Sequence, residues 1–122
     1  MRDLLAVMKA LADENRLRIV AALDGRELCL CQIVELLGLA TSTVSRHTSI
    51  LQQARLIRSR KQGRWTYFRL DDEAPAAAHD AAALVIRELS RDRRGSHDRK
   101  RLTQILKTDP EELCRKQSEC KC

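Results

Sequence analysis

The sequence has no hydrophobic run near the roughly 20 residues that a membrane-spanning helix needs. This absence excludes an integral membrane protein of the helical class. The N-terminal stretch MRDLLAVMKALADENR lacks a small-residue cleavage site and becomes charged within a few positions, so it does not predict a signal peptide. We therefore expect a cytoplasmic protein that does not associate with a membrane.

The arrangements of residues that carry most enzyme chemistry are also missing. The chain has three histidines and four glycines, and they form neither a Ser–His–Asp set nor a phosphate-cradling glycine loop. No pair of carboxylates falls on facing strands. These absences predict that the protein is not an enzyme.

What is present is a small, positively charged globular chain. Its 122 residues suffice for one hydrophobic core, and 43% hydrophobic with 33% charged residues excludes general disorder. The formal charge of +6 favours an acidic partner, of which nucleic acid is the commonest. In a reducing compartment, the five cysteines are expected as thiols or metal ligands rather than disulfides.

Apolar periodicity predicts four helices in the first half of the chain. The first covers residues 3–11, and the second follows Asp13 as its N-cap and stops at the Asp-Gly pair 24–25. A third helix begins near Cys31 or Gln32 and ends at Gly38. The fourth covers 41–53 with Thr41 or Ser42 as its cap, so the last two form a helix-turn-helix.

The period then changes to that of strands. LIRSRKQGRWTYFRL predicts two antiparallel strands near 56–61 and 65–70, joined at Gly63, which supplies the positive φ of a tight hairpin. All three aromatic residues, Trp65, Tyr67 and Phe68, fall in the second strand. A helix pair followed by a basic hairpin is a winged helix-turn-helix, so the fold class is mainly α with a small β-hairpin.

The rest of the chain divides into two parts. An alanine-rich helix from Glu73 carries a stripe of small residues, which together with 3–11 predicts a helix-mediated homodimer. We expect a charged break at 91–101, a short amphipathic piece, a helix that starts at Pro110 after the cap Asp109, and a mobile tail, QSECKC. Residues 1–90 then form the DNA-binding and dimerisation domain, and 91–122 form a charged C-terminal extension with a cysteine-containing tail.

Two groups of polar residues are candidates for contact with double-stranded DNA. One is a face of the helix at 41–53, where short hydroxyls and one guanidinium suit the major groove. The other surrounds the hairpin tip, where cations reach phosphates. The candidates are Ser42, Thr43, Ser45, Arg46, His47, Ser49, Arg58, Arg60, Lys61, Gln62 and Arg64. Of these, His47 lies between two faces, where a histidine more often packs or hydrogen-bonds than binds a ligand.

Residues 5–70 resemble the ArsR/SmtB-type metalloregulatory repressors, and among them the arsenic-responsive branch. The resemblance rests on LADENRLRIVAAL, GRELCLCQIVELLG, STVSRHTSILQQARLI and RKQGRWTYFRL. It implies a homodimeric winged-helix repressor that binds the operator of its own operon and releases it when a toxic metal or metalloid binds. For the arsenic branch the inducers are As(III) or Sb(III), held by cysteine thiolates.

The cysteines depart from that branch in one position. Its best-known form has three cysteines at i, i+2 and i+5; Cys29 and Cys31 match the first two, but Val34 occupies the third. The third sulfur is then Cys114, Cys120 or Cys122, or a water or small thiol completes the site, or the tail forms a site of its own. The remaining interpretation is that Cys29 and Cys31 are simply small buried residues at the start of a helix. His79 and His97 lack the spacing of the zinc-sensing branch.

Residues two apart point about 200° apart in a helix but to the same side in extended chain. Cys29 and Cys31 can therefore share one ion only if the first turn of their helix is loose. Drawing both sulfurs together would distort the helix that braces the recognition helix, which is a route from inducer to operator. The alternatives are a redox or soft-metal (Cd, Pb or Hg) switch of the same fold, or a small metal-binding protein.

Overall fold

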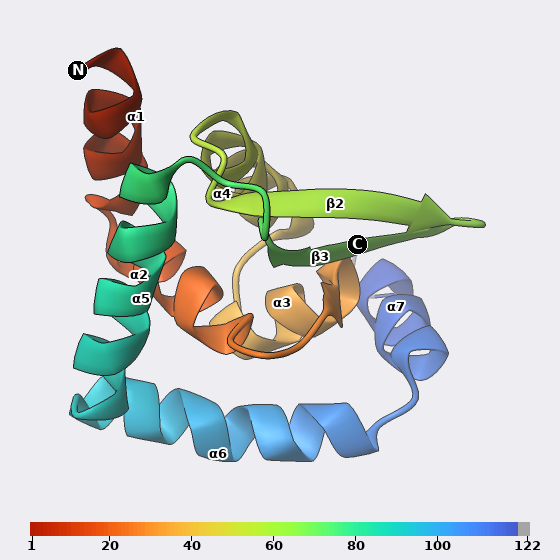
Figure 1. Cartoon of the computed structure of the whole chain (residues 1–122). Helices are drawn as coiled ribbons and strands as arrows, with labels where there is room; N and C mark the ends of the chain where they lie inside the picture. The colour runs from red at the N-terminus through yellow and green to blue at the C-terminus, as the bar shows by residue number, and fades with distance from the viewer. Residues whose placement is uncertain (120–122) are drawn as a thin grey trace.

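The computed structural model describes residues 1–119 (Figure 1). The described residues form a helical body with a small antiparallel sheet, and among them no helix has the length and apolarity that crossing a bilayer demands. The elements are α1 (Arg2–Leu11), α2 (Glu14–Ala22), β1 (Leu28–Cys29), α3 (Leu30–Leu37), α4 (Thr41–Gln53), β2 (Ile57–Gln62), β3 (Trp65–Leu70), α5 (Ala76–Ser90), α6 (Arg93–Lys107) and α7 (Pro110–Glu119).

The predicted helix-turn-helix is confirmed as α3 and α4, with α2 packed behind them. Asp13 caps α2, because its carboxylate accepts the N–H groups of Asn15 and Arg16 at 2.8 and 3.1 Å. Gly38 ends α3 with φ +67°, the left-handed conformation that glycine adopts without strain. The predicted cap of α4 is wrong: Ala40 occupies the N-cap and no side chain caps that helix.

The predicted hairpin is confirmed as β2 and β3, which pair from Ile57↔Leu70 to Gln62↔Trp65. Gly63 and Arg64 form the two-residue loop, and Gly63 has φ +62°. A positive φ at the first loop position alone is the pattern of a type II′ turn, whose twist matches that of the strands. The wing is therefore a regular hairpin with Arg64 at its tip.

The sheet has a third strand that the sequence did not predict. The two-residue strand β1 pairs antiparallel with β3, with Leu28 opposite Phe68 and Cys29 opposite Tyr67, so the strand order is β1-β3-β2. Two residues are too few to show any alternation of polar and apolar side chains. This pairing attaches the entry of α3 directly to the base of the wing.

The hydrophobic core lies where α2, α3 and α4 meet the sheet. Its centre consists of side chains with essentially no exposed surface: Ile19, Leu28, Ile33, Val44, Leu51 and Ile57. The side of α4 predicted to face inward, with Val44, Thr48 and Leu51, is buried as expected. Packing of α4 against this core fixes which of its side chains face outward.

The alanine-rich helix begins later than predicted, at Ala76 rather than Glu73, because Pro75 occupies its N-cap. Ala78, Ala82 and Val85 face the core, and α5 packs along α1. The outer side of this helix pair exposes large apolar side chains. Leu4, Leu5, Met8 and Leu84 are each 46–55% exposed, an apolar surface that spans α1 and α5.

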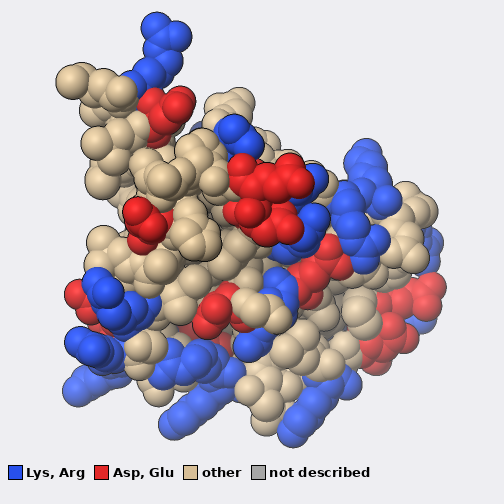
Figure 2. All heavy atoms as spheres, in the orientation of Figure 1, with Lys and Arg blue, Asp and Glu red and all other residues tan. Residues whose placement is uncertain are grey.

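The predicted charged break at 91–101 is wrong. Only Arg91 and Asp92 separate α5 from α6, which crosses beneath the rest of the body (Figure 1). Asp92 caps the helix by accepting the N–H of Arg94 at 2.8 Å. The buried side of α6 reads Gly95, Asp98, Leu102 and Ile105, a helical spacing obscured in the sequence because two of these residues are not apolar. Its cations face outward, along the lower edge in Figure 2.

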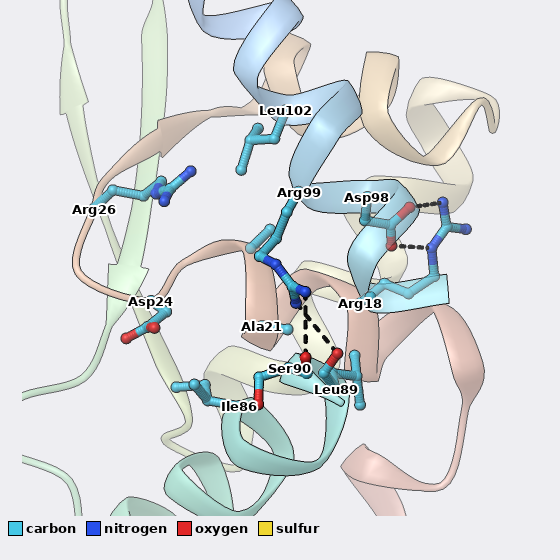
Figure 3. A pocket seen from close by; sticks show the side chains of 12 residues that line it. Arg18, Ala21, Asp24, Arg26, Ile86, Leu89, Ser90, Asp98, Arg99 and Leu102 are labelled. Carbon is cyan, nitrogen blue, oxygen red and sulfur yellow. Dashed lines mark hydrogen bonds and ion pairs between the residues drawn. The ribbon is translucent and has the colours of Figure 1, made fainter. Parts of the chain in front are cut away.

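A buried ion pair attaches α6 to the helix-turn-helix. The Arg18 guanidinium donates to both carboxylate oxygens of Asp98, at 2.8 and 3.1 Å, with both side chains almost fully buried (Figure 3). The same guanidinium also donates to the carbonyl of Leu36 in α3. Beside it, Arg99 donates to the last carbonyls of α5, at Leu89 and Ser90. These bonds hold α2, α3, α5 and α6 in one arrangement.

We predict that Asp98→Asn lowers the free energy of unfolding by about 3–5 kcal/mol, because it leaves the Arg18 guanidinium buried without a countercharge. Chemical denaturation monitored by circular dichroism measures this loss. Glu35→Gln is the matched control: it removes the pairing of Glu35 with Arg101, which is 3.4 Å long and partly exposed, and should change stability by less than about 1 kcal/mol. Equal losses in the two variants would contradict the role given to the buried pair.

Candidate DNA-binding surface and thiol site

The recognition helix α4 presents a polar surface away from the core. Ser42, Thr43, Arg46 and Ser49 are exposed, and Ser45 is half-buried beside them. His47 is placed differently, since it is only 9% exposed and its Nδ1 lies 3.2 Å from a guanidinium nitrogen of Arg16. His47 therefore connects α4 to α2, and the other predicted residues of α4 form the surface open to a ligand.

The cations of the wing are mostly engaged by nearby carboxylates. Arg58 lies 3.3 Å from Asp72, and Arg60 donates to both oxygens of Glu27, at 2.7 and 2.9 Å. Arg60 also stacks over the ring of Tyr67 and donates to Gln62. Lys61, by contrast, is exposed and has no ion pair within residues 1–119. Because an exposed ion pair is weak, a phosphate can compete for these arginines.

The Arg60–Glu27 contact depends on the charge of the Glu27 carboxyl. The hydrogen bonds from Arg60 hold the pKa of the Glu27 carboxyl below its ordinary value. A carboxyl with a lowered pKa keeps its charge, and with it the contact, above that pKa and loses both as the pH falls through it. Glu27 directly precedes β1, so this ion pair joins the hairpin to the segment that leads into the cysteines.

Cys29 occupies the entry of α3. Its backbone is extended, with φ −81° and ψ 161°, and it is the N-cap of the helix. Its thiol faces the N–H groups at the helix start, while its own N–H donates to Oε1 of Gln32 at 2.9 Å. The side chain is 1% exposed, and this burial raises the pKa of the Cys29 thiol despite the helix N–H groups nearby. The protonated thiol is therefore the favoured form.

Cys31 lies in the first turn of the same helix and is close to a cysteine from the far end of the chain. Its sulfur is bonded to that of Cys114 in α7, and the two Cα atoms are 5.4 Å apart. The Gln117 amide donates to the carbonyl of Cys31 at 2.9 Å, and Leu113 is buried. This bond differs from the expectation of thiols, because α7 packs on α3 and brings together two sulfurs that the sequence separates by 83 positions.

The three predicted candidates for a third sulfur are thus separated. Cys114 lies against Cys31, whereas Cys120 and Cys122 fall outside the described residues. Among residues 1–119, no three Cys, His, Asp or Glu side chains are grouped so that they could hold a metal ion. Val34 is buried in the core. The donors suit a soft ion chemically, but Cys29 joins the other two only if the entry of α3 opens.

Sequence reasoning did not predict the contact between the tip of the wing and the C-terminal helix. Arg64, at the tip of the wing, lies 2.9 Å from Glu111 in the first turn of α7. The cap Asp109 and the start at Pro110 were both predicted and are found. The docking of α7 was not predictable, because it depends on where the unexpected helix α6 ends. The only signal was the pair of acidic residues in its first turn.

Comparison with known proteins gives one consistent relationship. The sequence profile described as "Bacterial regulatory protein, arsR family" matches residues 13–59. A cadmium resistance transcriptional regulatory protein CadC homolog of Staphylococcus aureus is 36% identical over 90 residues, 72% of this chain and 74% of that protein. An arsenical resistance operon repressor of Escherichia coli is 41% identical over 73 residues, 59% of this chain and 62% of that protein.

The fold comparison agrees. A homodimeric winged helix-turn-helix DNA-binding domain, Mb0332 of Mycobacterium bovis, superimposes with a TM-score of 0.58 at 28% identity, covering 69% of this chain and 72% of that one. The predicted fold class is therefore confirmed for the winged helix-turn-helix, and the related proteins are regulators rather than enzymes, as the sequence predicted.

We predict that Cys29 is the slowest of the three described cysteines to be alkylated in the folded, reduced protein. Its thiol is buried and its pKa is raised, whereas Cys31 and Cys114 are only half-buried. Iodoacetamide labelling at pH 7 and pH 9, followed by peptide mass spectrometry, measures the three rates. In guanidinium chloride the rates should become equal. Fast labelling of Cys29 in the folded protein would show that the entry of α3 is already open.

Proposed function

Because the chain belongs to the arsR family of bacterial regulatory proteins, we propose that it is a homodimeric cytoplasmic repressor that releases operator DNA when As(III) or Sb(III) binds its cysteine thiolates. The observation that carries the inducer proposal is the placement of two cysteines at the entry of α3, one of them bonded to Cys114, so that reduction leaves three thiols on two packed helices.

The DNA contact rests on α4 and the wing together. The exposed hydroxyls and Arg46 of α4 suit base edges and phosphates in the major groove. The wing carries Arg58, Arg60, Lys61 and Arg64 on the adjoining hairpin, where cations reach the backbone beside the groove. One such unit reads only a few base pairs, so a useful operator requires two copies.

The second copy is supported by the apolar surface on α1 and α5. Leu4, Leu5, Met8 and Leu84 are about half exposed in the single chain. Large apolar side chains exposed on two packed helices are typical of an interface between proteins. A symmetric pairing of α1 and α5 with the same helices of a second copy would bury it and place two recognition helices on one duplex.

The inducer proposal follows from the softness of sulfur. Thiolates select thiophilic ions, and the related proteins are named for arsenical and cadmium resistance. Such an ion gains most by drawing several sulfurs together, and this requires the Cys29 cap to rearrange. Since α3 packs directly on α4, a changed entry of α3 alters the position of the recognition helix. The ion shifts the equilibrium only by its preference for the rearranged state.

A redox switch of the same fold is the second candidate, because the structure bonds Cys31 to Cys114. In that reaction the two thiols lose two protons and two electrons to an oxidant such as a peroxide, which is reduced to water. Cadmium remains an alternative ion at the same sulfurs. The family relationship favours a regulator over the small metal-binding protein that the sequence also allowed.

We predict that Cys29→Ser keeps the affinity for operator DNA within about twofold and abolishes release by arsenite, because it removes a sulfur but leaves α4 and the wing intact. Fluorescence anisotropy of a labelled operator, titrated with arsenite, Cd(II) and hydrogen peroxide in parallel, measures this. Release by peroxide alone would favour the redox candidate. Release of the variant by arsenite at the wild-type concentration would remove Cys29 from the site.

We also predict that Arg46→Ala and Lys61→Ala each make the salt dependence of DNA binding shallower. Each phosphate contact that is lost reduces the slope of log K against log salt by about 0.9. Lys100→Ala is the control, since it removes an equal charge from the exposed side of α6 and should leave the slope unchanged. A slope reduced equally in all three variants would mean that net charge, not contact, governs binding.

A further inference from the structure

Helix α7 contacts two functional parts of the molecule at once. At α3, Cys114 meets Cys31 and Gln117 bonds the Cys31 carbonyl. At the wing, Glu111 pairs with Arg64 at 2.9 Å. These residues come from a single ten-residue helix. A bond that holds Cys114 and Gln117 against α3 therefore also holds Glu111 next to Arg64. We refer to α7 as the arm.

The arm places acidic side chains beside the wing, the surface that we propose contacts DNA phosphates. Glu111 and Glu112 of the arm, with Asp109 just before it, line a cleft beside Arg64 and Trp65 at the tip of the hairpin, and Arg115 is the one cation of the arm in this lining. Figure 2 shows acidic next to basic side chains on this side of the molecule. A DNA phosphate that approaches the wing seeks the same guanidinium that Glu111 already occupies, so arm and duplex compete for Arg64.

The sulfur pair decides how firmly the arm is held. Without a link between the sulfurs, the arm is attached by Leu113, by the Gln117 bond and by an ion pair whose two side chains are 75% and 64% exposed. An ion pair this exposed contributes little. A ligand shared by Cys31 and Cys114 ties the arm to α3 and makes the Glu111–Arg64 contact effectively intramolecular at high local concentration.

We propose that Cys114 supplies the third sulfur of the thiol site and that the arm is an inhibitory element. A small-molecule thiol first reduces the Cys31–Cys114 bond to two thiols and is itself oxidised to a disulfide; arsenous acid then exchanges its three hydroxyl groups for the sulfurs of Cys29, Cys31 and Cys114 and releases three waters. With Cys31 and Cys114 linked through the ion, Glu111 is held on Arg64 and the wing loses a phosphate contact. The proposal rests on the proposed function and adds to it the identity of the third ligand and a second route to release. Because linkage is reciprocal, DNA that captures Arg64 weakens the binding of the ion.

The first test compares Glu111→Gln with Glu112→Gln in the full chain. Both remove one negative charge one residue apart, but among the described residues only Glu111 pairs with the wing. The salt slope of operator binding is measured for reduced and for arsenite-loaded protein. In the wild type and in Glu112→Gln, loading should make the slope shallower by about 0.9, one phosphate contact. In Glu111→Gln this difference should disappear. Identical behaviour of the two variants would overturn the proposal.

The second test counts sulfur neighbours of bound arsenic by X-ray absorption. Cys114→Ser should lower the count from three to two, whereas Cys122→Ser should leave it at three; a count of three in Cys114→Ser would overturn the assignment. Arsenite release that is equal in wild type and Cys114→Ser refutes the arm but leaves the proposed function in place. Arsenite that binds wild type without releasing DNA refutes the proposed function, while the salt slopes of the Glu111 and Glu112 variants still test the arm.

Discussion

The buried contact between Arg18 and Asp98 is the constraint on which the arrangement of the thiol site depends. It lies in the region where α2, α3 and α6 meet, and the Arg18 guanidinium is satisfied by a carboxylate from one element and a carbonyl from another. A charge buried in this way tolerates few alternative arrangements, because each would leave it unpaired. With α6 held in this orientation, the chain that leaves it at Lys107 is delivered to the side of α3 that carries Cys31.

The sequence predicted most of the winged helix-turn-helix because each of its elements has a local signal. Asp13 caps a helix, Gly63 requires a tight loop, and Val44 with Leu51 repeats at helical spacing. The parts that were missed lack such signals. Strand β1 has two residues, and the buried side of α6 includes Gly95 and Asp98, one without a side chain and the other charged.

The candidate site divides in the same manner. The polar surface of α4 was predicted from helical periodicity alone. Cys29 and Cys31 were singled out because they are two thiols only two residues apart at the start of a predicted helix. The contact between Cys31 and Cys114 could be named only as one of three options, because its choice depends on the path of α6 and α7 through space. For His47, the position between two faces favoured packing or hydrogen bonding over contact with a ligand, and the structure agrees: the side chain is buried and its partner is Arg16.

Cys29 and Cys31 have different backbone conformations, so an ion that binds both sulfurs acts on more than one element of the fold. Cys29 is extended and paired with β3, whereas Cys31 is helical and held by the arm. An ion that draws both sulfurs to one centre must therefore act on the sheet, on α3 and on α7 together. Each of these elements leads to a part proposed to contact DNA: β3 and α7 to the wing, and α3 to α4. Under the proposed function, small displacements at the sulfurs would thus reach both halves of the candidate DNA-binding surface, and in a dimer they would act on both half-sites of the operator at once.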